Sequence, residues 1–305
     1  MNIIEWLLDS DPAIRWQVMR DLTDAPADEV AAERARVARE GWGAQLLALQ
    51  QADGSWSGGA YDPEWTSTTS TLQLLRHFGL DPASDAARHA IPRVRDVRWE
   101  YDKHGPMRFF EGEVEPCING QAVAVGAYFG EDVRGIVDRL LTEQMEDGGW
   151  NCEQERGSTR GSFETTLNVL EGLLAYERAT GANPDVTAAR NRGHEYLLER
   201  RLLRRLSDGE IGQKRWLYIG FPNGWHYDAV RALDYFRDAG VEPEERMAEA
   251  RDIVEAKRDA DGRWPLDYAY HDELLVDLDE RQGQPSRWIT LRALRILRWA
   301  DGKKQ

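Results

Sequence analysis

Cysteine, long apolar runs and positive charge are all scarce in this 305-residue sequence. Only Cys117 and Cys152 are present, which excludes a disulfide framework, allows one disulfide at most and favours a reduced, cytoplasmic location. No apolar run approaches the roughly 20 residues needed to cross a bilayer, so we expect no membrane span. The N-terminal segment carries Glu5, Asp9 and Asp11 where a signal peptide would have basic residues.

The charge balance excludes two further classes of partner. The sequence has 54 acidic and 39 basic residues, and its formal net charge is −15. Such a chain repels the phosphates of nucleic acids and the surface of anionic membranes, so neither is an expected partner. A small molecule is the expected ligand, and the sequence predicts no particular oligomeric state.

A repeated turn is the most prominent feature that the sequence does contain. The strings "ADGSW", "EDGGW" and "ADGRW" place a tryptophan two residues after Gly54, Gly148 and Gly262, and weaker versions surround Gly105 and Gly209. A charge-rich helix is predicted before each turn, over 28–50, 85–97, 131–145, 184–203 and 244–259. A more apolar helix is predicted after each turn, over 66–79, 117–130, 162–177, 225–240 and 286–299, and segment 11–22 resembles this second set.

The alternation of polar and apolar helices predicts two layers, with the polar helices facing solvent and the apolar helices inside. No segment shows the period-two alternation of a strand. Six such pairs predict an all-α fold, an (α/α)6 toroid that forms a single domain over residues 1–305. An open solenoid of helix pairs is the alternative arrangement.

The spacing of Gln50, Gly54 and Trp56, repeated in Gln144, Gly148 and Trp150, resembles the QW motif of squalene and other class II terpene cyclases. The third copy has Arg258 in place of the glutamine. The strings "TSTTSTLQLL" and "ETTLNVLEGL" also look like this superfamily, which includes the β subunits of protein prenyltransferases. The resemblance implies a toroid in which the glutamine ties down the start of the next helix and the tryptophan stacks upon it, so these turns are structural first.

Alignment of the apolar helices places Arg20, Gln73, Glu171, Arg231 and Arg292 at one equivalent position. Residues three, four and seven positions away share the same helix face, and a polar stripe on such a face is costly in a dry core. We therefore expect a wet central cavity whose ligand-binding residues are Trp16, Arg20, Trp65, Thr69, Gln73, Gln121, Asn168, Glu171, Tyr227, Arg231, Trp288 and Arg292. The alternative is that these groups pair with one another between helices, for example Glu171 with Arg231 or Arg292.

The resemblance implies two kinds of chemistry. Class II terpene cyclases protonate an alkene with a DxDD motif, which the helix starts at 66–69 and 164–166 lack; the nearest string, "DLDE" at 277–280, is expected to be a solvated loop. Protein prenyltransferases bind Zn²⁺ through Asp, Cys and His, and the candidate ligands here are Cys117, Cys152 and His226. No Asp-x-Cys pair exists, and protein prenylation would also need a partner α subunit. Otherwise the two cysteines are small buried hydrophobic residues.

Acid–base chemistry is the remaining route, with Glu164, His226 and Asp228 as catalytic candidates and the arginines steering an anionic or polyhydroxylated substrate.

The expected function is a cyclase-like or prenyltransferase-like enzyme for an isoprenoid or diphosphate-like substrate. The substrate is expected among the N-terminal ends of the inner helices, where helix dipoles favour anions. One alternative is an enzyme for a polar or glycan substrate, such as a lyase, epimerase or hydrolase. The other is a non-catalytic binding or scaffold protein. Cavity walls of Trp, Tyr and Leu would favour an isoprenoid, whereas converging Arg, Glu and Asp would favour a polar substrate.

Overall fold

The computed structural model describes residues 2–100, 107–270 and 273–302, so the weak turn around Gly105 lies outside the described residues. The described residues contain helices and isolated β-bridges but no strand, which confirms the predicted all-α class. None of their helices is both long and apolar enough to pass through a bilayer. The α-helices are α1 (Ile3–Leu8), α2 (Pro12–Leu22), α3 (Ala27–Ala35), α4 (Gly41–Ala48), α5 (Thr68–Phe78), α6 (Asp85–Val94), α7 (Pro116–Phe129), α8 (Arg134–Thr142), α9 (Phe163–Thr180), α10 (Pro184–Glu199), α11 (Ala229–Asp238), α12 (Ala248–Ala256) and α13 (Arg287–Ala300).

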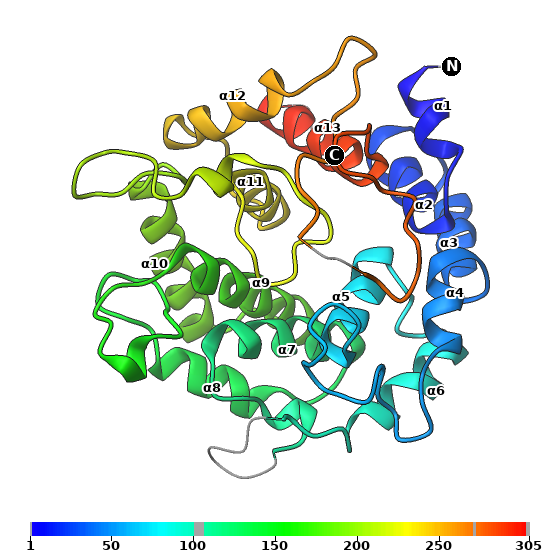
Figure 1. Cartoon of the computed structure of the whole chain (residues 1–305), viewed down its shortest axis with the longest axis horizontal. Helices are drawn as coiled ribbons and strands as arrows, with labels where there is room; N and C mark the ends of the chain where they lie inside the picture. The colour runs from blue at the N-terminus through cyan, green and yellow to red at the C-terminus, as the bar shows by residue number, and fades with distance from the viewer. Residues whose placement is uncertain (1, 101–106, 271–272, 303–305) are drawn as a thin grey trace.

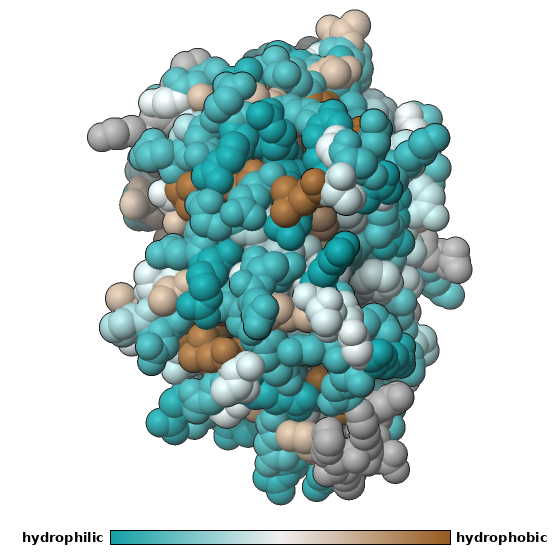
Figure 2. Space-filling model, turned by 90° about the vertical axis from the view of Figure 1, so that its left-hand side faces the viewer, coloured by the Kyte–Doolittle hydropathy of each residue, from teal (hydrophilic) through white to brown (hydrophobic). Residues whose placement is uncertain are grey.

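The helices are arranged in an inner and an outer set (Figure 1). Helices α2, α5, α7, α9, α11 and α13 lie nearer the centre of the view, and α3, α4, α6, α8, α10 and α12 lie outside them. The inner set matches the predicted apolar helices. The face of the molecule in Figure 2 is mostly hydrophilic, with small separate hydrophobic patches, as expected when polar helices face solvent.

Local signals in the sequence set the ends of the inner helices. Ser162 and Ser286 are N-caps whose hydroxyl groups accept from the backbone N–H of Thr165 (3.1 Å) and Ile289 (3.0 Å). Gly79 and Gly130 end α5 and α7 in the left-handed conformation, with φ of 80° and 79°. A glycine adopts this conformation without steric cost, so both helices end there.

The first polar segment is not the single helix predicted over 28–50. It is divided into α3, a 3₁₀ turn (Arg36–Ala38) and α4. Gly41 has a φ of +61°, and a Cβ there would lie 1.9 Å from Oδ2 of Asp11. The same carboxylate accepts from the backbone N–H of Trp42 at 2.8 Å. Asp11 therefore holds the break between α3 and α4 in place. Because this contact joins residues far apart in the chain, helical periodicity does not reveal it.

The three tryptophan turns have the same construction. Trp56, Trp150 and Trp264 are fully buried. Their indole Nε1 atoms donate to the carbonyl ten residues earlier, at 2.7, 2.7 and 2.6 Å, in Leu46, Leu140 and Val254. Their backbone N–H groups donate at 3.1, 3.0 and 3.0 Å to a threonine Oγ1 of the following inner helix, in Thr68, Thr166 and Thr290. Each indole thus joins an outer helix to the next inner helix, which is a structural role.

The glutamines of these turns act differently from the expectation. Gln50 Nε2 donates to the carbonyl groups of Gly54 and Ala90, both at 2.9 Å. Gln144 Nε2 donates at 2.8 Å to the corresponding carbonyl groups of Gly148 and Ala189. Since the amide donates to carbonyl groups, it ties its own turn to the neighbouring outer helix and not to the start of the next inner helix.

Helices near the two ends of the chain contact each other. Helix α13 contacts α2. The guanidinium groups of Arg263 and Arg287 lie 4.5 and 4.8 Å from the ring centroid of Trp6 in α1. Helix α1 thus contacts the third tryptophan turn from the side.

Candidate functional site

The principal candidate is a cavity of about 520 Å³, to which all six inner helices contribute. Small-molecule sites commonly enclose roughly 300–1,000 Å³. Most of the expected ligand-binding residues line it, namely Trp16, Arg20, Trp65, Gln73, Gln121, Glu171, Arg231, Trp288 and Arg292.

The cavity runs along the inner helices from their N-terminal toward their C-terminal ends. Its lining includes Ser70, Arg231 and Trp288 in the first turns of α5, α11 and α13, and it reaches Ala179 in α9 and Gly79 after α5. The helix dipoles favour anions at the N-terminal end, where the substrate was expected, and cations at the other. Side chains must therefore supply most of any preference for anions.

Arginine dominates the charge of the lining. The eight lining arginines face three lining acids, Glu171, Asp234 and Asp238, a difference of 8 − 3 = +5. The arginines are Arg20, Arg34, Arg76, Arg178, Arg231, Arg237, Arg292 and Arg295. Five of these, Arg34, Arg76, Arg178, Arg237 and Arg295, were not predicted, although Arg76, Arg178 and Arg295 lie three or seven residues after the predicted Gln73, Glu171 and Arg292 on the same helix faces.

The lining acids are all engaged by arginine. Arg231 donates to both carboxylate oxygens of Glu171 at 2.9 Å, and Arg76 lies 3.8 Å from the same group. The expected alternative, pairing across the inner helices, therefore occurs together with the cavity. Asp234 is paired with Arg237 at 2.9 Å and with Arg292 at 3.4 Å. Pairing of this kind fixes the walls of a pocket.

Two lining arginines, Arg34 and Arg295, are not paired with a lining acid. Arg34 donates to Gly79 O at 2.8 Å and to Tyr128 Oη at 3.0 Å, and it has no ion pair with a described residue. Arg295 pairs with Asp21, which also binds Arg20. Burial, together with the positive charges of Arg237 and Arg20, lowers the pKa of Arg295 to about 10. Arg295 is thus cationic at neutral pH.

Three buried donors of lining residues, Gln121 Nε2, Trp288 Nε1 and Arg295 Nε, have no hydrogen-bond acceptor among the described residues, and the buried ring nitrogen His77 Nδ1 has no partner there either. The residues of the three donors are only 4%, 6% and 8% exposed. A buried donor without an acceptor costs about 1–3 kcal/mol, so a ligand that supplies acceptors would be stabilised here.

An aromatic surface adjoins these donors. The rings of Trp288 and Phe221 are stacked with their centroids 4.4 Å apart. Trp16 is fixed by donation of its Nε1 to Phe78 O at 2.8 Å, and the Arg20 guanidinium lies 4.7 Å from its ring centroid. The cavity can therefore hold an anionic group and a flat apolar group together.

All three catalytic candidates lie outside the lining, and two of them make structural contacts. Glu164 Oε1 accepts from Arg215 at 2.8 Å and from Trp216 Nε1 at 3.0 Å, which attaches the 3₁₀ turn Lys214–Leu217 to α9. Asp228 is the N-cap of α11, accepts from the backbone N–H of Arg231 at 2.7 Å and is fully buried.

The third catalytic candidate, His226, is enclosed by aromatic rings outside the cavity lining. Its ring centroid lies 4.0 Å from that of Trp225, 4.2 Å from Tyr270 and 5.9 Å from Trp65. Burial lowers the pKa of His226 to about 4, so the ring is neutral at physiological pH.

Three expected ligand-binding residues also lie outside the lining. Thr69 Oγ1 and Tyr227 Oη each donate to a backbone carbonyl at 2.7 Å, in Ala60 and Leu202. Asn168 Nδ2 donates to Trp225 O at 2.8 Å. Thr69 and Tyr227 therefore hold the backbone, whereas Asn168 Oδ1 also accepts from Nη2 of the lining Arg231 at 3.0 Å. Helix-face alignment could not distinguish these contacts from a cavity role.

The acidic string at 277–280 contains an unexpected, partly buried group. Asp277 is exposed and pairs with Arg281, as expected of a solvated loop. Glu280, in contrast, accepts from the backbone N–H of Trp288 at 3.4 Å, and burial raises its pKa to about 7. Sequence reasoning missed Glu280 because its burial depends on the start of α13.

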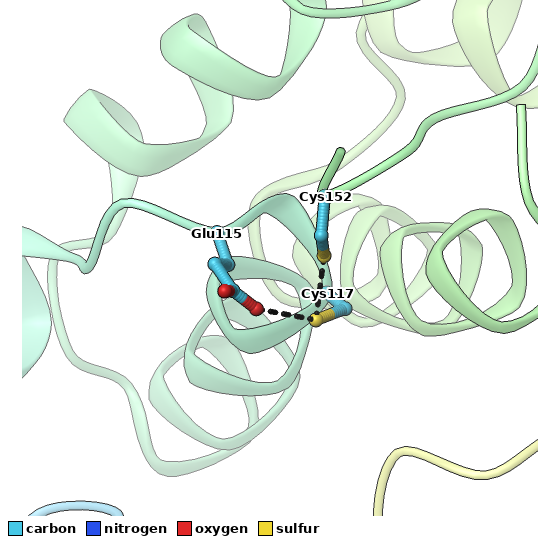
Figure 3. Close-up of side chains that lie close together, drawn as sticks. All are labelled: Glu115, Cys117 and Cys152. Carbon is cyan, nitrogen blue, oxygen red and sulfur yellow. Dashed lines mark hydrogen bonds between the residues drawn. The ribbon is translucent and has the colours of Figure 1, made fainter. Parts of the chain in front are cut away.

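The predicted metal ligands are only partly brought together. Cys117 and Cys152 are free thiols whose sulfur atoms lie 2.8 Å apart. The third group beside them is Glu115, whose Oε2 is 3.7 Å from Cys117 Sγ, and not His226 (Figure 3). We call these three residues the cysteine cluster. The sequence already contains an acid, Glu115, two residues before Cys117. It was not predicted as a ligand because the pattern of the prenyltransferases has an aspartate at this position.

The chain matches no protein-family model and no curated protein.

Proposed function

We propose that this protein is a single-domain (α/α)6 toroid whose central cavity binds a small anion rich in hydrogen-bond acceptors, with a diphosphate-bearing molecule as the first candidate. The toroid is supported by the contribution of six inner helices to one cavity and by the contact between α2 and α13. The position of α1 beside the third tryptophan turn also supports it.

The observation that carries the ligand class is the excess of arginine inside a protein whose net charge is −15. Guanidinium groups bind phosphate and carboxylate oxygens in a bidentate manner. The unpartnered donors of Gln121, Trp288 and Arg295 add hydrogen bonds for such oxygens. A neutral ligand would leave most of these groups without acceptors.

Among the expected functions, the wall composition favours a polar, anionic substrate over an isoprenoid chain alone. A prenyl diphosphate would use both the arginines and the aromatic surface of Trp288, Phe221 and Trp16. Since each lining acid is paired with arginine, we assign binding and orientation of the anion to these residues and no acid–base step.

Calorimetric titration with inorganic diphosphate, a prenyl diphosphate and the matching prenyl alcohol tests the proposal. We expect both anions to bind with one-to-one stoichiometry and the alcohol to bind at least tenfold more weakly. Arg34→Met should weaken the binding of both anions about tenfold, equivalent to about 1.4 kcal/mol. Arg95→Met is the matched control, because Arg95 pairs with Glu131 away from the cavity lining.

Two results would overturn the ligand class. One is an alcohol that binds as tightly as its diphosphate, which would indicate an apolar site. The other is equal anion affinity in Arg34→Met and Arg95→Met, which would place the binding outside the cavity. Release of inorganic diphosphate from the prenyl diphosphate, measured separately, would show that the protein also converts this ligand.

A further inference from the structure

We propose that the cysteine cluster, Glu115, Cys117 and Cys152, is a Zn²⁺ site separate from the central cavity. One ligand atom from each residue lies within 4.8 Å of the others. None of the three residues lines the cavity. The inference therefore does not depend on the proposed anion binding.

The chemistry of the donor set fits this cation. Two thiolates and a carboxylate are ligands of the borderline-soft Zn²⁺, whereas Mg²⁺ and Ca²⁺ require oxygen ligands. Three protein ligands leave a fourth tetrahedral position for water or a small ligand. Cys152 is only partly buried, so solvent reaches one side of the cluster.

The three ligands are held on a rigid base. Cys117 lies in the first turn of α7, directly after Pro116. Cys152 Sγ is 3.5 Å from Thr165 Oγ1 in the first turn of α9. Helices α7 and α9 pack backbone to backbone, since a Cβ at Gly172 would lie 2.4 Å from Gly120 O. The two helix starts are therefore fixed relative to each other. On binding, the sulfur atoms would move from 2.8 Å to the roughly 3.8 Å separation of two thiolates on a tetrahedral Zn²⁺, through rotation of the cysteine side chains.

Reduced, metal-free full-length protein should bind one Zn²⁺ per chain, measured by elemental analysis after removal of unbound metal. Co²⁺ should replace it and show the intense sulfur-to-cobalt charge-transfer absorption of thiolate ligation. Cys117→Ser and Cys152→Ser should each lower the Zn²⁺ affinity at least a hundredfold, and Glu115→Gln about tenfold.

Matched variants distinguish this ligand set from a site that uses His226 or a different acid of the same loop. Glu111→Gln, in that loop, and His226→Ala should keep the wild-type affinity. Unfolding temperatures measured without metal identify any variant that fails to fold. If a cysteine variant fails to fold, the Zn²⁺ affinity of Glu115→Gln tests the proposal. Absence of sulfur-to-cobalt absorption, or loss of Zn²⁺ in His226→Ala with retention in Glu115→Gln, would overturn the proposal. So would metal-free protein that keeps both thiols reduced, by thiol titration, yet binds no Zn²⁺.

Discussion

The central cavity and the cysteine cluster are opposite in charge. The cavity has eight arginines for three acids, whereas the cluster consists of a carboxylate and two thiols beside Tyr61 and Glu64. Both lie in one strongly acidic chain, so net charge predicts neither. The contrast indicates that local pairing decides ligand class: anions belong where arginines exceed their acids, and cations where acids have no arginine.

The largest expected effect comes from removing the acid that two cavity arginines share. Glu171→Gln leaves Arg231 and Arg76 without their carboxylate, and we expect a loss of about 3 kcal/mol in the free energy of unfolding. Inorganic diphosphate should bind more tightly to this variant, because it then supplies the missing negative charge. Urea unfolding and calorimetry measure the two effects.

Glu195→Gln is the control for this variant, since its pair with Arg246 is solvent-exposed and should contribute less than about 1 kcal/mol. Equal stability of the two variants would contradict the buried arginine network.

The next largest effect is expected for substitutions in two tryptophan turns, of which only one lies next to the cysteine cluster. Trp150→Phe and Trp264→Phe each remove an indole donor and leave a buried carbonyl, in Leu140 or Val254, without it. Each should cost about 1–3 kcal/mol of unfolding free energy. Only Trp150→Phe should also weaken Zn²⁺ binding, by about tenfold, because Cys152 follows Trp150 by two residues. Similar Zn²⁺ affinities in both variants would show that the turn does not position the cysteine.

The smallest effect is a pH dependence beside the cavity. The pKa of Glu280 is raised from 4.5 to about 7 by burial. Between these values the folded state keeps a proton that the unfolded state has lost, so rising pH lowers the stability until about pH 7. A full shift of this size would correspond to about 3 kcal/mol, at about 1.4 kcal/mol per pKa unit, and solvent access to the partly exposed carboxyl reduces the expected change to on the order of 1 kcal/mol.

Glu280→Gln should flatten this part of the pH profile, measured by thermal unfolding from about pH 4.5 to pH 8. Asp277→Asn, at an exposed ion pair in the same loop, should not. A wild-type profile that is already flat over this range would contradict the raised pKa.

Much of the helix order could be predicted, and the site only in part. The periodicity of "TTSTLQLLRHF" and its serine cap are local properties, so α5 follows from the sequence itself. The polar stripe identified Arg20, Gln73, Glu171, Arg231 and Arg292 as lining residues because they occupy equivalent helix faces. The same reasoning placed Tyr227 on the cavity face, whereas its hydroxyl donates to the carbonyl of Leu202, since a polar group near a helix start can equally bind a neighbouring carbonyl.

Short stretches of sequence determine the positions and ends of the inner helices and the repeated tryptophan turns, because capping and helix periodicity act over a few residues. The meeting of Glu115 with Cys152, of Arg295 with Asp21 and of α1 with the turn at Gly262 became evident only in the folded molecule. These contacts join residues far apart in the chain, and their geometry depends on how every intervening helix packs.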